Sequence, residues 1–188
     1  MSKNEQTVQA EAFFDKKALG EEASRGLQTT PEITKALSAR FHFVLRKSGG
    51  LGIPLAKKGT DVGFVGITNF EGNSYPVIRK ESPTTFDYLL LDLKEDAQGN
   101  FRILRTYSLL AGEWSTTVYR RVLIERFVEL KGDLNKLEPA DRDFAQNSKL
   151  IYDFTVAGMT GKFAEMNGIY SQLPDSLAKK PWLRKLRL

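Results

Sequence analysis

The clearest alternation of apolar and polar positions lies in residues 86–110. Two apolar runs, FDYLLLDLKE and FRILRTYSLL, flank the segment DAQGN. Alternation is typical of strands, and a short segment rich in Asp, Gly and Asn between two of them predicts a hairpin. Along the first run we expect Leu89, Leu91 and Leu93 to face a core, while the intervening row is mixed.

After Gly112 the apolar positions recur every three or four residues, which predicts a helix over residues 115–131. Its expected buried stripe consists of Val118, Val122, Leu123, Phe127 and Leu130. Ser115 or Thr116 stands where a helix cap is expected, and Gly132 follows the end.

The earlier part of the chain predicts two helices and two strands. Residues 8–28 carry a helical pattern, and TTPEITKALSARF predicts a helix over 31–41, with Thr30 as its cap and Pro31 in its first turn. The segment FHFVLRK fits either the end of that helix or the start of a strand. VGFVGITNF and YPVIRKE predict strands, the first with a bulge at its glycines.

The last third of the chain has a helical period. FAQNSKLIYDFTVAGM and GKFAEMNGIYSQL predict a helical hairpin after residue 141. Its second helix resembles the second helix of a tetratricopeptide repeat at Gly161, Phe163, Met166, Tyr170 and Leu173. The closing segment PWLRKLRL is typical of the start of a further helix, so we expect a helical array that continues.

This order predicts an α+β fold. We expect a curved antiparallel sheet of about four strands, packed by helices 31–41 and 115–131, with a C-terminal helical hairpin. A cystatin-like or nuclear-transport-factor-like arrangement fits the order of elements. The expected division is an α+β domain over residues 1–135 and a tetratricopeptide-like extension over residues 141–188.

The composition excludes several chemistries. The chain has no cysteine and one histidine, so disulfides, thiol catalysis, cysteine-ligated zinc and multi-histidine metal sites are ruled out. The net charge of +5 comes wholly from the last ten residues, KKPWLRKLRL, which contain no acid, and the rest of the chain is balanced. A basic end says much less about nucleic acid than a basic stripe across a fold would.

The corner Gly112-Glu113-Trp114-Ser115 is the most suggestive place for a catalytic group. A nucleophile elbow needs G-x-S-x-G, which this corner does not match, and the sole imidazole, His42, is far away in the sequence. We therefore interpret the corner as architecture and expect no catalytic residue, metal or cofactor. The loop SGGLGIPLAKKG could hold an anion with Lys57 and Lys58, but it does not follow G-x-G-x-x-G, and we interpret it as a flexible surface loop at which ligand contacts are to be watched for.

One long segment, FDYLLLDLKEDAQGNFRILRTYSLLAGEWST followed by YRRVL, resembles a group of uncharacterised bacterial proteins. They pair an N-terminal α+β domain with tetratricopeptide-like helices. The group's tyrosine, Gly-Glu pair and helix-capping serine correspond here to Tyr107, Gly112, Glu113 and Ser115. Its second strand commonly carries an Asp before the tyrosine, where this chain has Arg105 and Thr106. The resemblance covers residues 60–180 and implies the architecture and a bacterial source, but no known activity.

We expect a non-enzymatic protein-interaction module that uses the surface between the sheet and the C-terminal helices. Its partner would be a protein of unidentified kind. The candidate surface residues are Phe163, Tyr170, Trp182, Arg184 and Lys185.

Two alternatives stay open. The first is a small-ligand or hydrolytic pocket inside the curved sheet, formed by His42, Tyr88, Asp92 and Tyr107. The second is binding of anionic lipid or nucleic acid through the basic tail, although we do not expect either as the main partner. The N-terminus lacks the features of a signal peptide and no run is long enough to cross a membrane. We therefore expect a soluble protein of the cytoplasm, or of the periplasm if a signal has been removed.

Overall fold

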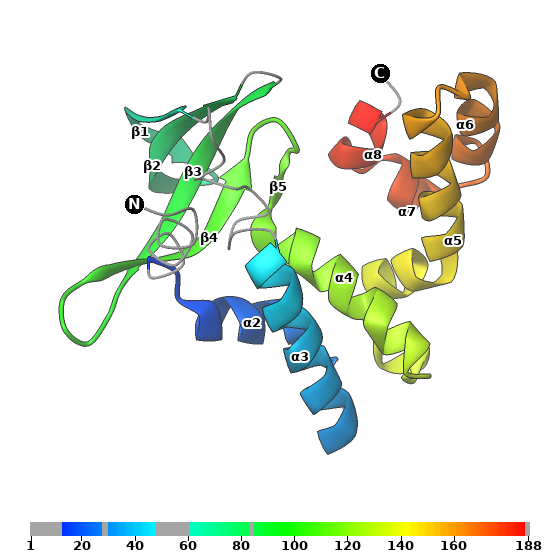
Figure 1. Ribbon diagram of the computed structural model, residues 1–188, viewed down its shortest axis with the longest axis horizontal. Coiled ribbons are helices and arrows are strands. Elements are labelled where there is room, and N and C mark those ends of the chain that lie inside the picture. The colour runs from blue at the N-terminus through cyan, green and yellow to red at the C-terminus, as the bar shows by residue number, and fades with distance from the viewer. Residues whose placement is uncertain (1–12, 28–29, 48–60, 83–84, 187–188) are drawn as a thin grey trace.

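The computed structural model describes residues 13–27, 30–47, 61–82 and 85–186, and it confirms the α+β class. The helices are α2 (Lys16–Ser24), α3 (Pro31–Lys47), α4 (Ser115–Glu129), α5 (Pro139–Met159), α6 (Phe163–Tyr170), α7 (Asp175–Ala178) and α8 (Pro181–Leu186), with a 3-10 turn η1 (Leu134–Lys136). The strands are β1 (Asp61–Phe70), β2 (Asn73–Ser82), β3 (Thr85–Glu95), β4 (Phe101–Ser108) and β5 (Glu113–Trp114). Figure 1 shows the sheet at one end of the molecule and α5–α8 at the other, with α4 between them.

The sheet is open and antiparallel, with its five strands in the order β1-β2-β3-β4-β5. The first four are the predicted strands, and β5 is a two-residue strand at the corner that ends the sheet. The predicted hairpin at DAQGN is confirmed. In its turn the Asp96 carboxylate accepts hydrogen bonds from the N–H groups of Gln98 and Asn100, at 3.0 and 2.9 Å.

Two bulges shape the sheet. The predicted bulge in β1 is confirmed, because the pairing with β2 shifts register between Phe64 and Gly66. A second shift lies opposite Asp92 and Leu93, where Leu104 is the extra residue of β4. Each bulge adds one residue to its strand and increases the local twist. Residues on the two sides of a bulge therefore face differently from what simple alternation predicts.

The prediction for the leucine row of β3 is wrong in part. Leu89 is fully buried, but Leu91 is half-buried and Leu93 is exposed. Leu90, which belongs to the other row, is 1% exposed and packs with Tyr75 and Val77. The reason is that aromatic side chains from neighbouring strands gather on the face that was expected to be mixed.

Helix α3 begins as predicted and ends later. The Thr30 hydroxyl oxygen accepts a hydrogen bond from the Ile33 N–H at 3.3 Å, so this cap is confirmed. The alternative that FHFVLRK starts a strand is wrong, because Phe41 and Leu45 extend the buried stripe of Leu37 by further helical turns. α3 packs mainly against α4 instead of covering the sheet, and the helices in contact with β4 are α2 and α4.

Helix α4 is the centre of the main core. Its buried side chains include Tyr119, Leu123 and Phe127, whereas Val118 and Val122 are only partly buried, so the predicted stripe is rotated. α4 contacts α2, α3, α5 and the sheet, and a helix packed on several sides needs no single apolar stripe. The core continues through Leu137 into α5–α8, where the predicted hairpin is confirmed as α5 and α6. The same core thus contains residues of both segments, 1–135 and 141–188.

Candidate functional site

The turn between β4 and β5 is built by short polar contacts. Gly112 has φ 71°, a conformation in which glycine carries no steric penalty. The Asp87 carboxylate accepts hydrogen bonds from the Ser108 hydroxyl at 2.5 Å and from the Leu110 N–H at 2.9 Å. The Ser108 oxygen in turn accepts one from the Ala111 N–H at 2.8 Å. These contacts hold the corner where the sheet ends and α4 begins.

Glu113 is held in an ion pair. Arg121 donates from Nη1 and Nη2 to the two carboxylate oxygens of Glu113, at 2.6 and 2.7 Å. Both side chains are mostly buried, with 11% of Glu113 and 18% of Arg121 exposed. The guanidinium of Arg121 also lies over the ring of Trp182, 4.3 Å from its centroid. The ion pair therefore joins β5 to α4, and Arg121 extends the connection to Trp182 of α8.

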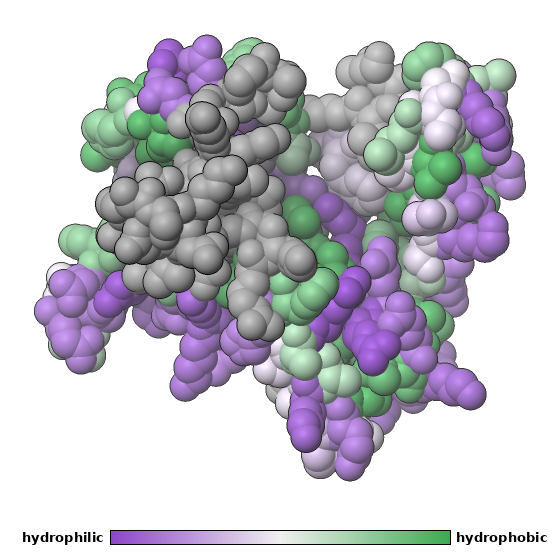
Figure 2. Space-filling model, in the orientation of Figure 1, coloured by the Kyte–Doolittle hydropathy of each residue, from purple (hydrophilic) through white to green (hydrophobic). Residues whose placement is uncertain are grey.

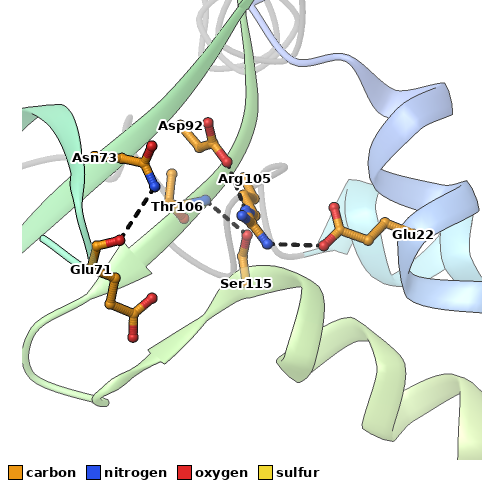
Figure 3. Close-up of polar contacts among 7 residues, drawn as sticks. All are labelled: Glu22, Glu71, Asn73, Asp92, Arg105, Thr106 and Ser115. Carbon is orange, nitrogen blue, oxygen red and sulfur yellow. Dashed lines mark hydrogen bonds and ion pairs between the residues drawn. The ribbon is translucent and has the colours of Figure 1, made fainter.

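Ser115 serves the backbone of the neighbouring strand. Its buried hydroxyl oxygen accepts a hydrogen bond from the Thr106 N–H at 3.0 Å, as Figure 3 shows. The prediction that Ser115 or Thr116 caps the helix is wrong, because α4 already begins at Ser115 and the residue before it, Trp114, makes no capping bond with its side chain. The Ser115 hydroxyl instead accepts the hydrogen bond of the Thr106 N–H in β4. Thr106 lies one residue before the part of β4 that pairs with β5.

His42 lies away from this corner. It is an exposed residue of α3 whose ring makes an edge contact with Phe41, with centroids 5.7 Å apart. The hollow that His42 lines is formed by α2, α3 and Leu123, and it contains neither Glu113 nor Ser115. In the described part of the chain, His42 and Ser115 thus belong to different surroundings, α3 and the start of α4.

The aromatic face of the sheet, which we define by Phe70, Tyr75, Tyr107 and Trp114, carries the densest group of rings. Tyr107 lies 4.7 Å from Phe70 and 5.3 Å from Trp114, and Tyr75 lies 5.5 Å from Trp114, all between centroids. These tilted and edge-on contacts are the arrangements that aromatic pairs prefer. The face is therefore a small second core on the sheet.

Arg105 closes one end of the aromatic face. Its guanidinium lies over Trp114 at 4.3 Å, donates from Nε to Asp92 at 2.7 Å and from Nη1 to Glu22 at 3.0 Å (Figure 3). Burial alone would lower the pKa of Arg105, but the hydrogen bond with Asp92 and the charges of Glu22 and Asp92 outweigh it, so its pKa lies above the ordinary value. Arg105 therefore stays charged and joins α2 to β3 and β4.

Three of the four residues predicted for a sheet pocket share this face. Tyr107 belongs to the aromatic face, and Tyr88 packs in the same cluster. Asp92 lies beyond them in the ion pair with Arg105. His42 does not join them. The residues predicted for the pocket did not include Arg105, Trp114 and Glu22, and Arg105 contacts the other two at this face. Unbroken pairing of β4 with β3 across the hairpin would place Leu104 opposite Asp92, and only the bulge brings Arg105 to that position.

A hollow of about 390 Å³ opens on the same side of the sheet, beside β1. It is lined by Val65–Phe70 of β1 together with Val77, Tyr88, Leu90 and Leu109. Most of these side chains are apolar. Its volume lies at the small end of the range for ligand pockets, and it would hold one or two apolar side chains.

Strand β1 lies at the edge of the sheet and, among the described residues, pairs with β2 alone. Phe64 and Ile67 are each 71% exposed and Val65 is 56% exposed. Val62, Phe64 and Ile67 lie opposite alternate residues of β2, so the bulge keeps them in one row, and Ile67 of that row also lines the hollow. From Val62 to Phe70 the strand has no charged residue and no proline, which are the usual protections of an edge. In Figure 2 hydrophobic atoms reach the surface at the position of β1.

The residues predicted for an interaction surface on the C-terminal helices have different surroundings. Phe163 and Arg184 are exposed. Tyr170 donates its hydroxyl to the Ala178 carbonyl at 2.6 Å, and Trp182 packs on Arg121. The Lys185 side chain lies outside the described residues, as does the loop SGGLGIPLAKKG. A separate exposed row on α5 and α6 consists of Tyr152, Val156, Met159 and Phe163.

In the described parts of the chain, no three His, Cys, Asp or Glu side chains lie close enough together to hold a metal ion. None of the helices in those parts combines the length and apolar character that crossing a membrane requires. No family model, no curated protein and no solved structure matches this chain. Within the described residues, the edge of β1 that has no partner strand and the adjoining hollow are the most distinctive features of the molecule.

Proposed function

We propose that this protein is a non-enzymatic interaction module that binds an extended polypeptide segment along the free edge of β1. The observation that carries the proposal is β1 itself, a ten-residue edge strand with exposed apolar side chains and no charge between Val62 and Phe70. Such an edge is a template for pairing with another chain.

The backbone of β1 supplies the first part of the interaction. Along an edge strand, alternate N–H and C=O groups point away from the sheet, and an added strand satisfies them with a second ladder of hydrogen bonds. The tight turn at Glu71 and Gly72, with φ 51° and 82°, fixes the register of β1 against β2. The edge is therefore held in strand conformation before a partner arrives, which lowers the entropic cost of binding.

The side chains of β1 supply the second part. Phe64 and Ile67 are exposed, and residues 65–70 border the hollow together with Tyr88 and Leu90. The side chains of an added strand point alternately to the two faces of the sheet. One set can therefore pack on the exposed side chains of β1 while the other set fills the hollow. The partner that fits is an extended segment with apolar residues on both faces and no charge in its centre.

The C-terminal helices do not form part of this site. The exposed row on α5 and α6 lies at the opposite end of the molecule from β1 in Figure 1, so one short segment cannot span both. Trp182, which a membrane-binding tail would need as its anchor, is packed on Arg121. A small apolar ligand in the hollow beside β1 is the second candidate, favoured by its volume of about 390 Å³.

The test uses a labelled peptide with the sequence of β1, DVGFVGITNF, flanked by two lysines at each end for solubility. This sequence has the length of β1, and its only charged residue, Asp61, is at its first position. We expect saturable binding by fluorescence anisotropy. A copy that is N-methylated at alternate residues cannot donate along one edge and should bind at least about tenfold more weakly. Equal affinity of the two peptides would contradict strand addition and favour the second candidate, in which only side chains are held.

Matched variants locate the site. Ile67→Lys places a charge on the edge strand and should weaken binding of the peptide at least about tenfold. Phe163→Lys makes the same kind of change at a similarly exposed position on α6, and it should leave the affinity unchanged. If Phe163→Lys is the damaging change, the interaction surface lies on the C-terminal helices and the proposal for β1 is wrong.

A further inference from the structure

A second hollow, separate from β1, lies between α2 and α3 and has a volume of about 390 Å³. Both helices pack on α4, and they contact each other much less than they contact α4. Leu37 and Phe41 of α3, with Leu123 of α4, form an apolar lining, and all three side chains are buried as residues of the main core. The hollow thus opens directly onto the core.

Gly20 of α2 lines this space and contacts Phe41. A Cβ atom at Gly20 would lie 3.0 Å from Cε1 of Phe41, so a larger residue would require the ring to shift by a few tenths of an ångström. With no side chain at position 20, the space on either side of the contact stays open. Ser24 donates its hydroxyl to the Gly20 carbonyl at 2.7 Å, which satisfies the polar group on this wall.

Among the described residues, the charged side chains at the rim of the hollow are two lysines and one glutamate. Lys16 and Lys17 of α2 and His42 of α3 line it, together with one carboxylate, Glu21. The ion pair of Lys17 with Glu21 is long, at 4.0 Å, and both side chains are largely exposed, so it holds Lys17 only weakly. Thr34 and Ser38 add hydroxyl groups.

We propose that this hollow binds a small amphipathic anion, with its apolar part against Leu37 and Leu123 and its anionic head at the lysine-bearing rim. An apolar lining with a few convergent polar groups is the usual construction of a small-molecule site. The excess of positive groups at the rim selects the anion over a neutral or cationic molecule of the same shape.

The test uses decanoate as the probe, with decanol and decyltrimethylammonium as uncharged and cationic analogues. His42 is the only histidine of the chain, so its ring C–H signals in proton NMR report on this hollow alone. We expect decanoate to shift these signals saturably. Removing both cations by Lys16→Gln with Lys17→Gln should weaken decanoate roughly fivefold and leave decanol unchanged, since exposed ion pairs contribute at this level. Equal binding of all three probes would overturn the assignment of an anion.

Two tryptophan variants on α3 test the place of binding. Ser38→Trp fills the hollow and should abolish the shift of His42, whereas Ala39→Trp, at the adjacent exposed position that does not line it, should retain the shift. Retained binding in Ser38→Trp, or a His42 signal that decanoate does not move in the unaltered protein, would overturn the proposal. The β1 peptide should bind equally with and without decanoate, so the two sites succeed or fail separately.

Discussion

Arg121 holds Glu113 through two parallel hydrogen bonds, at 2.6 and 2.7 Å, and lies on the ring of Trp182 with its other surface. One guanidinium therefore connects β5, α4 and α8. The pair is mostly buried, and a buried carboxylate without its partner is strongly destabilising. Glu113 and Ser115 of the Gly-Glu-Trp-Ser corner therefore both make contacts that hold the fold together.

Removing Arg121 should therefore destabilise the whole fold. We expect Arg121→Ala to lower the free energy of unfolding by about 3 kcal/mol, because Glu113 is left buried and unpaired. The NMR signal of the Trp182 indole N–H should also move. Arg126→Ala is the matched control on the same helix, since Arg126 pairs with Glu129 at the surface and its loss should cost less than about 1 kcal/mol. Equal effects in denaturant unfolding would contradict this role of Arg121.

Ser115 should matter for stability through a single acceptor. Ser115→Ala leaves the Thr106 N–H without its partner, and a buried unpaired donor costs about 1–3 kcal/mol. Thr117→Ala alters an exposed residue two positions later and should change stability by less than about 0.5 kcal/mol. Denaturant unfolding and the amide exchange rate of Thr106 measure the effect. If the Ser115→Ala and Thr117→Ala proteins were equally stable, the hydrogen bond between Thr106 and Ser115 would not contribute to stability.

Two glycines should respond to alanine in opposite directions. A Cβ at Gly132 would lie 2.3 Å from Cζ of the fully buried Phe127, so Gly132→Ala should cost roughly 1–3 kcal/mol through overpacking. Gly168 lies within α6 with nothing within 4 Å of its Cβ position, so Gly168→Ala should stabilise the protein by up to about 1 kcal/mol. Thermal unfolding of the two variants checks the signs, and the same sign for both would contradict the packing described.

Asp96 should make the stability of the β3–β4 hairpin depend on pH. The hydrogen bond from the Asn100 N–H, with smaller help from Gln98 and Arg102, lowers the pKa of Asp96 below its ordinary value of 3.8, although desolvation opposes this. Because the folded pKa is the lower one, the stabilisation is present above pH 3.8 and is lost as pH falls through the folded pKa. Unfolding measured from pH 2 to 7 should therefore show the unaltered protein more stable than Asp96→Asn at neutral pH, with the difference closing in acid. A stability difference between the unaltered protein and Asp96→Asn that does not change with pH would contradict this role of Asp96.

Local signals in the sequence were enough for most of the elements. The DAQGN turn, the Thr30 cap and the change of period after Gly112 each act within a few residues, and each placed its element correctly. The bulge of β1 followed from its glycines for the same reason. The predictions that were wrong concern features that depend on contacts between distant segments. The stripe of α4 is rotated because four neighbours pack around it, and a pattern within one helix does not contain that information.

The candidate site was harder to predict for the same reason. Asp92 was singled out as a ligand, yet its partner Arg105 lies across a bulge and Glu22 comes from a separate helix. Tyr107 lies opposite Leu90, in the same row of β3 as Tyr88, only because of that bulge, and alternation along the two strands does not predict it. That β1 is the edge strand depends on the order of strands in the sheet, which no residue of β1 specifies.

We propose that β1 accepts another strand along the edge that does not pair with β2. The most direct measurement is amide hydrogen exchange by NMR, with and without the lysine-flanked β1 peptide. At ~90% saturation, the β1 amides that do not donate to β2 should exchange roughly tenfold more slowly, while the amides of α5 and α6 keep their rates. Unchanged rates along β1 in a protein that has bound the peptide would contradict strand addition.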